Sequence, residues 1–400
     1  MNLVLYTHPA FLNSQSHQHF ARMLVRAYLR RGHAVELRQP TAVVRQYFGG
    51  RWAKWAGYVD QYLVFPLRMR RQVADDPEQT LYVFCDQALG PWIPRVAHRP
   101  HVVHCHDLLA LRSALGQVPE NPTSWTGQIY QRYIRSGFQR AHHFISVSAK
   151  SREDLHVFGE VRPVTSEVVY NGLNHPYRRQ PADKAQAILR RAGLPPPSGF
   201  LLHIGGGQWY KNSVGVLHLY AQYVAMRLAA GRPVCPLWMV SPAPSAQLQV
   251  LVDRLPAEGQ VRFLHPLDTD SIEALYSLAS ALIFPSLAEG FGWPIAESLA
   301  CGCPVVTTGE APMNEVGGPH AHYLPRLPGA EGIPAWAKHG AELLCKILDR
   351  PEEAREAAAL AGIEWTQRFD SERAIESYLK IYASVLSGYA PGNTAKAAKS

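Results

Sequence analysis

Short apolar runs alternate with amphipathic segments along most of the chain, and this alternation constrains the fold more than any other feature of the sequence. The segment 16–31 carries apolar residues at helical spacing and follows the strand-like run 3–7. Strands that alternate with helices are typical of parallel sheets covered by helices on both faces. The strand-like runs form two series, 3–7, 34–38, 80–84, 101–105, 143–148 and 166–171, then 200–205, 236–241, 261–266, 280–286 and 304–308.

A cluster of proline, serine and glycine at 195–199 separates the two series, as expected of a linker. The chain has 400 residues, whereas a single hydrophobic core stops growing at roughly 250–300 residues. We therefore predict two doubly wound α/β domains, residues 1–185 and 199–370, with ligands bound between them at the carboxyl ends of the strands. The polar end of the chain, 389–400, is predicted to be a flexible tail.

We expect neither a membrane-spanning segment nor a secretory leader. No apolar run reaches the roughly 20 residues that a bilayer requires, and residues 1–11 lack a basic region followed by a long apolar stretch. The six cysteines are scattered and form no CxxC pair, which is typical of a reducing compartment. These features favour a cytoplasmic protein, located in solution or at the inner face of a membrane.

Positive charge is concentrated in the first half of the chain. The formal net charge is +8, and residues 1–180 hold 22 of the 40 basic residues but only 12 of the 32 acidic ones. This asymmetry suits a polyanionic partner such as nucleic acid, an anionic membrane or a phosphorylated acceptor. Arginines spread over solvated helices would give the same balance, so charge alone does not separate these alternatives.

The segment 45–71 interleaves arginine and lysine with Trp52, Trp55, Tyr58 and other aromatic residues. A helix of this composition could lie on an anionic membrane, where a lipid-linked acceptor would be found. The alternative is an ordinary helix of the first domain with its aromatic side chains turned inward. Interleaved aromatic residues also suit nucleic-acid stacking, but no other feature supports that function, and we expect no nucleic-acid partner.

Two glutamates flank a glycine-containing turn near the end of the second series. Glu289 follows the run 280–286, and Glu297 falls in the first turn of the helix that we expect next. Gly290 and Gly292 would let the backbone approach a ligand, and the N–H groups of a helix start favour an anion or sugar oxygens. Each carboxylate could accept hydrogen bonds from a diol of one elongated ligand. Two solvated charges would give the same pattern.

The stretch EGFGWPIAE resembles the E-x7-E signature of glycosyltransferase family 4, whose members are retaining enzymes of the GT-B architecture. The resemblance continues through ESLACGCPVVTTGEAPMNEVGG, is tightest over 261–318 and extends over nearly the whole chain. It implies two Rossmann-like domains facing across a cleft. The first would hold the acceptor and the second the nucleotide sugar, with the helix 371–388 crossing back to the first.

The same resemblance implies roles for the residues of this turn. Glu289 would contact the transferred sugar beside the reacting carbon and act in catalysis, whereas Glu297 would bind the ribose of the nucleotide. Gly290, Phe291 and Gly292 would line the sugar and the phosphates with backbone N–H groups.

A second motif, HIGGGQWYKN, follows the strand-like run 200–205. By itself it is a weak signal, because a tight turn has the same composition. The family carries at this place a lysine that neutralises the leaving diphosphate, so the resemblance assigns Gly206, Gly207, Lys211 and Asn212 to the donor site. The family often has an arginine beside the lysine, whereas this chain has Tyr210, and the source of a second cation stays open.

In the first half of the chain, the run 101–105 ends in His106 and Asp107, at the edge of the sheet where α/β proteins bind ligands. The resemblance makes His106 the second catalytic candidate, whereas we expect His104 to point into a core or to the opposite face. The candidates for acceptor recognition are Asp107 and three residues that follow the first strand, His8, Ser16 and His17.

The triplet Asp268–Asp270 has the D-x-D pattern that binds a metal in a different glycosyltransferase fold, but it precedes a predicted helix and fits a helix N-cap. We expect no metal and no cofactor. The resemblance implies a hexosyltransferase that moves a hexose from a UDP- or GDP-linked sugar to a glycan or lipid-linked acceptor, in bacterial surface polysaccharide or glycolipid synthesis. The alternatives are a catalytically silent binding subunit and an epimerase or hydrolase of the same fold.

Overall fold

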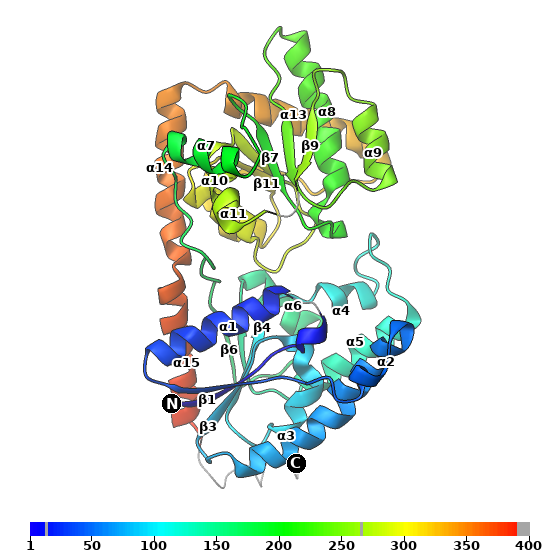
Figure 1. Cartoon of the computed structure of the whole chain (residues 1–400), viewed down its shortest axis with the longest axis vertical. Coiled ribbons are helices and arrows are strands. Elements are labelled where there is room, and N and C mark those ends of the chain that lie inside the picture. The colour runs from blue at the N-terminus through cyan, green and yellow to red at the C-terminus, as the bar shows by residue number, and fades with distance from the viewer. Residues whose placement is uncertain (13–14, 265–266, 390–400) are drawn as a thin grey trace. The chain divides into compact units, whose positions relative to one another are not determined.

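The computed structural model describes residues 1–12, 15–264 and 267–389, without the side chains of residues 15–17. It divides into two compact units, each with its own sheet. The first unit comprises Met1–Asn174 and the segment from Ser371 onward, and the second comprises His175–Asp370. Figure 1 labels their helices and strands. Of the tail predicted to be flexible, 390–400 lie outside the described residues.

The first unit is built around a parallel six-stranded sheet with the order β2-β1-β3-β4-β5-β6. All residues of its central strands β3 and β4 are buried, as expected of strands covered on both faces. The strands are β1 (Asn2–Tyr6), β2 (Ala34–Arg38), β3 (Thr80–Phe84), β4 (His101–Cys105), β5 (His143–Ser146) and β6 (Thr165–Val168).

Two separate cores lie on the two faces of this sheet, because successive side chains of a strand point to opposite faces. Val4 and Tyr6 of β1 join α3, η4 and α5 in one core, and Leu3 and Leu5 join α1 and α15 in the other. The helical elements are η1 (Ala10–Leu12), α1 (Gln15–Arg30), η2 (Arg45–Tyr47), α2 (Gly50–Val59), η3 (Asp60–Val64), α3 (Phe65–Asp75), η4 (Gln87–Arg95), α4 (Leu109–Ala114), α5 (Trp125–Phe138), α6 (Ala149–Val157) and α15 (Ser371–Ser387).

The elements α2, η3 and α3 form one continuous helix with a π-helical turn in the middle. The wider turn lies just before Pro66, which lacks the N–H that an α-helical hydrogen bond needs, and Phe65 N–H bonds to the carbonyl of Asp60. The buried carboxylate of Asp60 in turn accepts hydrogen bonds from the backbone N–H groups of Val44 and Arg45 at 2.8 and 2.9 Å. Among the described residues, no helix is long and apolar enough to cross a membrane.

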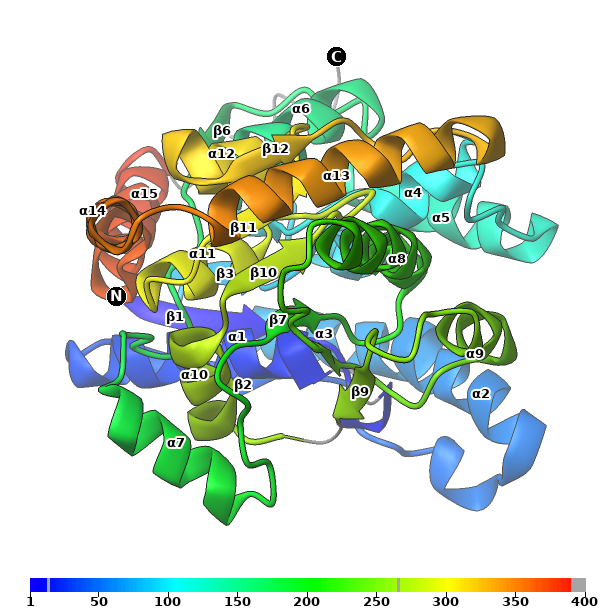
Figure 2. The same cartoon turned by 90° about the horizontal axis from the view of Figure 1, so that it is seen from above.

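The second unit repeats the architecture with a parallel sheet in the order β12-β11-β10-β7-β8-β9. Helices α8 and α13 pack against each other over one face, and Figure 2 shows them side by side. The elements are α7 (Ala182–Arg191), β7 (Leu201–Ile204), η5 (Trp209–Lys211), α8 (Ser213–Ala229), β8 (Leu237–Val240), α9 (Ala246–Asp253), β9 (Val261–Leu264), α10 (Thr269–Leu278), β10 (Ala281–Phe284), α11 (Trp293–Ala300), β11 (Val305–Thr308), α12 (Met313–Gly317), η6 (Gly318–His320), β12 (His322–Leu324), η7 (Ala330–Gly332), α13 (Ile333–Leu348), α14 (Glu352–Thr366) and η8 (Gln367–Phe369).

The predicted doubly wound α/β class is confirmed, with two differences in detail. The division between the units falls after Asn174 rather than between 185 and 199, because α7 packs on α10 and Gln180 donates to the buried carboxylate of Glu273 at 2.6 Å. The sequence also did not predict β12, which has only three residues and pairs with β11.

Candidate active site

Two loops of the second unit meet because the strands before them are neighbours in the sheet. β7 and β10 pair in parallel, so the loops that follow them leave the same edge. The N–H of Leu287 donates to the carbonyl of Tyr210 at 2.8 Å and ties the loops together. Parallel α/β sheets bind ligands at this edge. Two motifs that lie far apart in the sequence therefore form one surface.

The glycine loop after β7 is shaped by left-handed backbone positions. Gly207 has a φ of +80°, and Asn212 has a φ of 55° and a ψ of 44°. Asn212 caps α8 by accepting from the N–H of Gly215 at 3.0 Å, and its amide donates to the carbonyl of Pro285 at 2.9 Å. Because both polar ends of this buried side chain shape the turn, we propose a positioning role for Asn212 rather than donor contact.

Glycine is also needed at Gly205, whereas the exposed side chain of Gln208 could move away from a Cβ at Gly206. A Cβ on Gly205 would lie 2.8 Å from Nε2 of His203 and 3.1 Å from Cβ of Lys211. A Cβ on Gly206 would lie 2.8 Å from the side chain of Gln208. The prediction included Gly206 and Gly207 but not Gly205, whose missing side chain makes room for Lys211.

Lys211 and Glu289 form an ion pair across the two loops. Nζ of Lys211 donates to Oε1 of Glu289 at 2.7 Å, and the two side chains are 13% and 9% exposed. The ammonium also lies 4.7 Å from the ring centre of Phe284 and 5.3 Å from that of Tyr210. The position where the family often has an arginine thus holds an aromatic ring against the lysine.

Three buried polar atoms around these loops have no hydrogen-bond partner among the described residues: His203 Nε2, Ser286 Oγ and Trp293 Nε1. The ring of His203 is held through Nδ1, which lies 2.9 Å from the carbonyl of Ile283. Burial, together with the nearby charge of Lys211, lowers the pKa of His203 to about 4. Unsatisfied buried polar groups call for an explanation, and a polar ligand at this edge would supply one.

Glu297 lies deeper than Glu289. Gly292, with a φ of 102°, caps the start of α11, and Glu297 falls in the second turn of this helix rather than in the predicted first turn. Its side chain is buried, and Oε2 accepts a hydrogen bond from the hydroxyl of Tyr276 at 2.9 Å. Burial raises the pKa of Glu297 to about 7, although the Tyr276 hydroxyl and Lys211 act in the opposite direction.

Gly290 and Phe291 occupy the turn between the two glutamates. The ring of Phe291 is buried and makes an edge-on contact with Phe369, with ring centres 5.4 Å apart. Its side chain therefore anchors the turn in the core of the second unit. Donor contact by Gly290 or Phe291, which the resemblance implies through their backbone, stays a prediction.

His106 lies at the carboxyl edge of the sheet in the first unit. Its Nε2 lies 2.9 Å from the carbonyl of Cys85, and its backbone N–H donates to the amide oxygen of Gln87 at 3.0 Å. Donation from Nε2 leaves Nδ1 as the acceptor in the neutral ring. Phe20 makes an edge-on contact with the same ring at 4.7 Å between centres. The carbonyl of Cys85 and the ring of Phe20 thus orient the imidazole, and Gln87 holds the backbone of His106.

The remaining candidates of the first unit differ in how far the structure describes them. Nε2 of His8 lies 2.8 Å from the buried carboxylate of Asp86, and Asp107 accepts from the N–H of Leu109 at 2.9 Å. The side chains of Ser16 and His17 lie outside the part of the chain that the structure describes. His8, Asp86 and His106 follow β1, β3 and β4, which are adjacent strands.

Two functional candidates were missed in this unit, Asp86 and Gln87. Gln87 bridges His106 and Asp107, because its amide also donates to the carbonyl of Asp107. Their position directly after a buried strand was the available signal. His104 lies in the core, as predicted, with Nε2 2.6 Å from the hydroxyl of Tyr382.

Asp268 is the N-cap of α10 and accepts from the N–H of Ser271 at 2.7 Å. The N-cap is thus Asp268 and not Asp270, which the sequence had suggested as a capping-box partner of Glu273, and Glu273 is buried and accepts from Gln180. Within the described ranges, no group of three or more His, Cys, Asp or Glu side chains is arranged to hold a metal ion.

The sequence matches two family models, each within one unit. Residues 18–175 match Glycosyltransferase Family 4, and residues 186–324 match Glycosyl transferases group 1. The chain is 34% identical to O-antigen chain mannosyltransferase B of Escherichia coli, over 46% of this chain and 45% of that protein. It is 26% identical to O-antigen chain mannosyltransferase RfbU of Salmonella typhimurium, over 49% and 50%. The chain spans about half the length of these curated relatives.

A solved structure shows the same fold over nearly the whole chain. The crystal structure of Anabaena HepE in complex with UDP and glucose superposes with a TM-score of 0.69 and 19% identity, over 96% of this chain and 100% of that one. The fold is therefore that of the GT-B glycosyltransferases. The two family models, one in each unit, place the chain in glycosyltransferase family 4, the group 1 glycosyltransferases.

Proposed function

We propose that the protein transfers a hexose from a nucleoside diphosphate sugar to a hydroxyl of a glycan or lipid-linked acceptor, with retention at the anomeric carbon. The observation that carries this proposal is the largely buried pair of Lys211 and Glu289, held between two glycine-containing loops at the carboxyl edge of the second sheet. A fixed ammonium at such an edge suits a departing diphosphate, because it stabilises charge that develops during bond cleavage.

The ion pair also indicates how a donor would engage the site. In the structure the charge of Lys211 is neutralised by Glu289 at 2.7 Å. A diphosphate would compete for the ammonium, and the carboxylate of Glu289 would then be available to the sugar hydroxyls. Glu297 would accept a hydrogen bond from the ribose. The orphaned atoms of His203, Ser286 and Trp293 provide further polar contacts for a ligand.

His106 is our second catalytic candidate, in the first unit. Its ring is held by the carbonyl of Cys85 and by Phe20, and its backbone is held by Gln87. Such pre-organisation is what a group that positions substrate requires. We propose that His106 positions the sugar and that His8 and Asp107 recognise the acceptor. This assignment rests on the resemblance and on the place of these residues after β1 and β4.

The curated relatives are named as O-antigen chain mannosyltransferases. Their names support mannose as the transferred hexose and a bacterial surface polysaccharide as the acceptor. GDP-mannose and UDP-glucose are therefore the first donors to test, the second because a protein of the same fold was solved with UDP and glucose. We propose that transfer needs no metal, since Asp268 of the D-x-D triplet is used as a helix cap.

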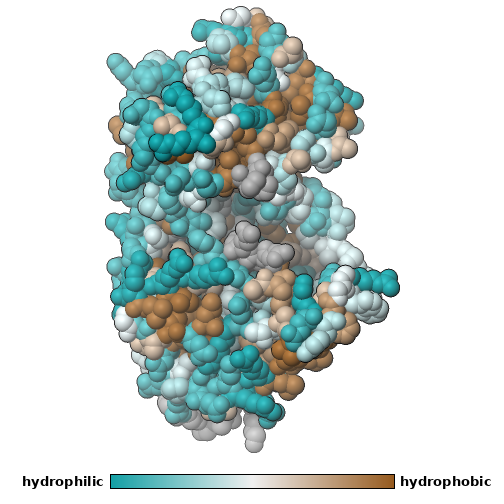
Figure 3. Space-filling view, in the orientation of Figure 1, coloured by the Kyte–Doolittle hydropathy of each residue, from teal (hydrophilic) through white to brown (hydrophobic). Residues whose placement is uncertain are grey.

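We further propose that the helix formed by α2, η3 and α3 contacts an anionic membrane. Trp52, Trp55, Leu63 and Leu67 are 60%, 61%, 62% and 67% exposed, and Figure 3 shows hydrophobic surface over this helix. Exposed arginine and lysine residues flank these side chains, as on interfacial helices.

The tyrosines turn inward instead, since the hydroxyl of Tyr62 lies 2.5 Å from that of Tyr130 on α5. The exposed basic residues of the helix are Arg51, Lys54, Arg68, Arg70 and Arg71.

Vesicle flotation tests the membrane contact. The wild-type protein should float with phosphatidylglycerol vesicles and remain in solution with phosphatidylcholine vesicles. The double variant Trp52→Ser/Trp55→Ser should lose most of this binding, whereas Leu360→Ser, an exposed leucine of α14, should keep it. Equal flotation of all three proteins would remove the helix from the proposal.

Transfer of radiolabelled sugar from GDP-mannose and UDP-glucose tests the main proposal. Glu289→Gln keeps the shape of the side chain and removes its charge, and we expect the transfer rate to fall by at least two orders of magnitude. The matched control is Glu331→Gln, an exposed glutamate of η7, which should leave the rate unchanged. Near wild-type transfer by Glu289→Gln would refute the catalytic assignment, and an inverted anomeric product would refute the retaining mechanism.

A further inference from the structure

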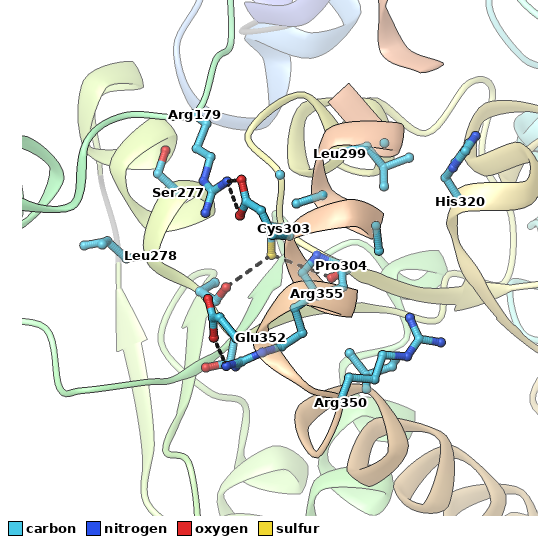
Figure 4. Close-up of a pocket in the computed structure, with 18 of the residues that line it drawn as sticks. Arg179, Ser277, Leu278, Leu299, Cys303, Pro304, His320, Arg350, Glu352 and Arg355 are labelled. Atoms are coloured by element: carbon cyan, nitrogen blue, oxygen red, sulfur yellow. Dashed lines mark hydrogen bonds and ion pairs between the residues drawn. The ribbon is translucent and has the colours of Figure 1, made fainter. Parts of the chain in front are cut away.

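A cavity lies at the edge of the second sheet opposite to the candidate active site. Ser280, Pro304 and His322 line it, and these residues precede or begin β10, β11 and β12. Lys211 and Glu289 instead follow β7 and β10 at the carboxyl ends of the strands. The cavity of about 270 Å³ is therefore a separate site within the same unit (Figure 4).

The cavity is rich in arginine and histidine side chains. Arg179, Arg350 and Arg355 line it together with His320 and His322, beside the two carboxylates of Glu352 and Glu356. These side chains come from the loop before α7, the turn between α13 and α14, the start of α14, η6 and β12. Guanidinium and imidazole groups from separate parts of the unit thus line one cavity.

Both carboxylates already have an arginine partner. Nη1 of Arg179 donates to the two oxygens of Glu356 at 2.8 and 2.7 Å, and Arg355 donates to Glu352. Figure 4 marks these pairs with dashed lines. Since each carboxylate neutralises one guanidinium, the third arginine, Arg350, supplies uncompensated positive charge.

Arg350 and His322 have unused hydrogen-bonding capacity. In the described part of the chain, neither side chain makes a hydrogen bond or an ion pair, although both are partly buried. Burial and the charge of Arg350 lower the pKa of His322. A guanidinium beside an imidazole without any acceptor is an unfavourable arrangement that a bound anion would relieve. Arginine is well suited to a phosphate, because its planar fork donates two parallel hydrogen bonds.

The start of α14 adds to the attraction for an anion. Glu352, Arg355 and Glu356 lie in the first turns of this 15-residue helix and line the cavity. The backbone N–H groups at a helix start favour negative charge. The guanidinium of Arg350 and this helix start therefore both attract an anion, and the imidazole of His322 can donate a hydrogen bond to it.

The size of the cavity limits the ligand. Its volume of about 270 Å³ lies below the roughly 300–1,000 Å³ of sites for drug-sized ligands. It is nevertheless more than eight times the volume of roughly 30 Å³ that one water molecule occupies in the liquid. It therefore has room for a phosphate that carries one small, hydroxyl-bearing group. Ser277, Ser280 and the second lone pairs of the two carboxylates can accept hydrogen bonds from hydroxyl groups.

We propose that this cavity binds a small, hydroxyl-bearing phosphate monoester, with the phosphate at Arg350 and His322. The site is separate from the proposed donor site, and the proposal does not depend on the transferase activity. Glucose 6-phosphate serves as the probe of this ligand class, and inorganic phosphate serves as the probe of the phosphate contact alone.

Isothermal titration of the full chain with each probe, at constant ionic strength, tests the site. Glucose 6-phosphate should bind the wild type and Arg254→Gln with the same Kd, since Arg254 is an exposed arginine at the end of α9. Arg350→Gln should weaken binding at least tenfold. His322→Asn, on a different element, should weaken it as well, which guards against a folding defect in one variant.

Two further results show at which site the ligand binds and which part of the ligand is recognised. Lys211→Ala should bind glucose 6-phosphate like the wild type, whereas loss of binding in this variant would place the ligand in the donor site and overturn the proposal. Unchanged binding in Arg350→Gln would overturn it too. Inorganic phosphate should bind more weakly than glucose 6-phosphate, and equal affinity would refute recognition of the hydroxyl-bearing part.

Discussion

The buried carboxyl of Glu297 makes the stability of the second unit depend on pH in a defined direction. Burial raises the pKa of this group from an ordinary value of 4.5 to about 7. Between these values the unfolded chain has released the proton and the folded chain still holds it. The folded state therefore binds more protons, and its stability falls as pH rises from about 4.5 to about 7.

The size of this effect follows from the difference between the two values. Each pH unit corresponds to about 1.4 kcal/mol, so ionisation of Glu297 should cost about 3 kcal/mol of unfolding free energy by pH 7. Above pH 7 the loss is complete, and below pH 4.5 it is absent. The hydroxyl of Tyr276, 2.9 Å from Oε2, limits the cost because it donates to the carboxylate.

Glu297→Gln isolates the effect, because glutamine keeps an oxygen that accepts from Tyr276 and does not titrate. Relative to the wild type, this variant should gain about 3 kcal/mol in stability between pH 4.5 and pH 8. For a domain of 150–250 residues, 1 kcal/mol shifts the Tm by roughly 2–4 °C. Calorimetry without ligand at several pH values should therefore show a difference in Tm that grows by roughly 6–12 °C.

The comparison of variant and wild type removes the contribution of all other titrating groups, provided that the substitution affects only Glu297. Glu331→Gln, at an exposed position, controls for the loss of one charge and should show a constant difference across the range. A difference between Glu297→Gln and the wild type that is the same at pH 5 and pH 8 would refute the burial of this carboxyl as described.

Four further substitutions at three positions test the packing of the candidate site. Tyr276→Phe removes the hydrogen bond that lowers the pKa of Glu297, so the pH-dependent loss of stability should extend above pH 7 in the same calorimetric assay. Asn212→Ala should cost about 1–2 kcal/mol in urea unfolding, because it removes the cap of α8 and forces alanine into a left-handed conformation. Asn212→Gly, which tolerates that conformation, should cost less, and a larger cost would contradict the reasoning. Gly207→Ala should be destabilised by about 1 kcal/mol in the same assay because of its φ of +80°.

The sequence predicts the central strands of both sheets well, because runs such as Thr80–Phe84 and Ala281–Phe284 are apolar and lie between turn residues. It fails at β12, where His322–Leu324 is too short to show a period. It also misplaces the division between the units. The proline cluster at 195–199 looks like a linker, but the contacts that fix the division, such as Gln180 with Glu273, join residues far apart in the sequence.

Within the candidate site, residue types at strand ends are predictable, whereas their partners are not. Lys211 and Glu289 could be selected from the sequence, because each lies in a motif that follows a strand-like run. Tyr276 could not, because nothing in SIEALYSLAS distinguishes a tyrosine that supports Glu297 from one that fills the core. Its role becomes visible only when α10 and α11 are placed beside each other.

The pairing of Lys211 with Glu289 was also not predicted, since the two residues were assigned to different parts of the donor. The strand order places β7 beside β10, so two opposite charges selected for separate tasks come within 2.7 Å. Breaking a largely buried pair leaves an uncompensated ammonium, which is costly unless another anion replaces the carboxylate. On the proposed function, a neutral sugar therefore could not release Glu289, whereas a sugar that carries a diphosphate could. The ion pair would then favour the activated donor over the free hexose, and free hexose should bind far more weakly than the nucleoside diphosphate.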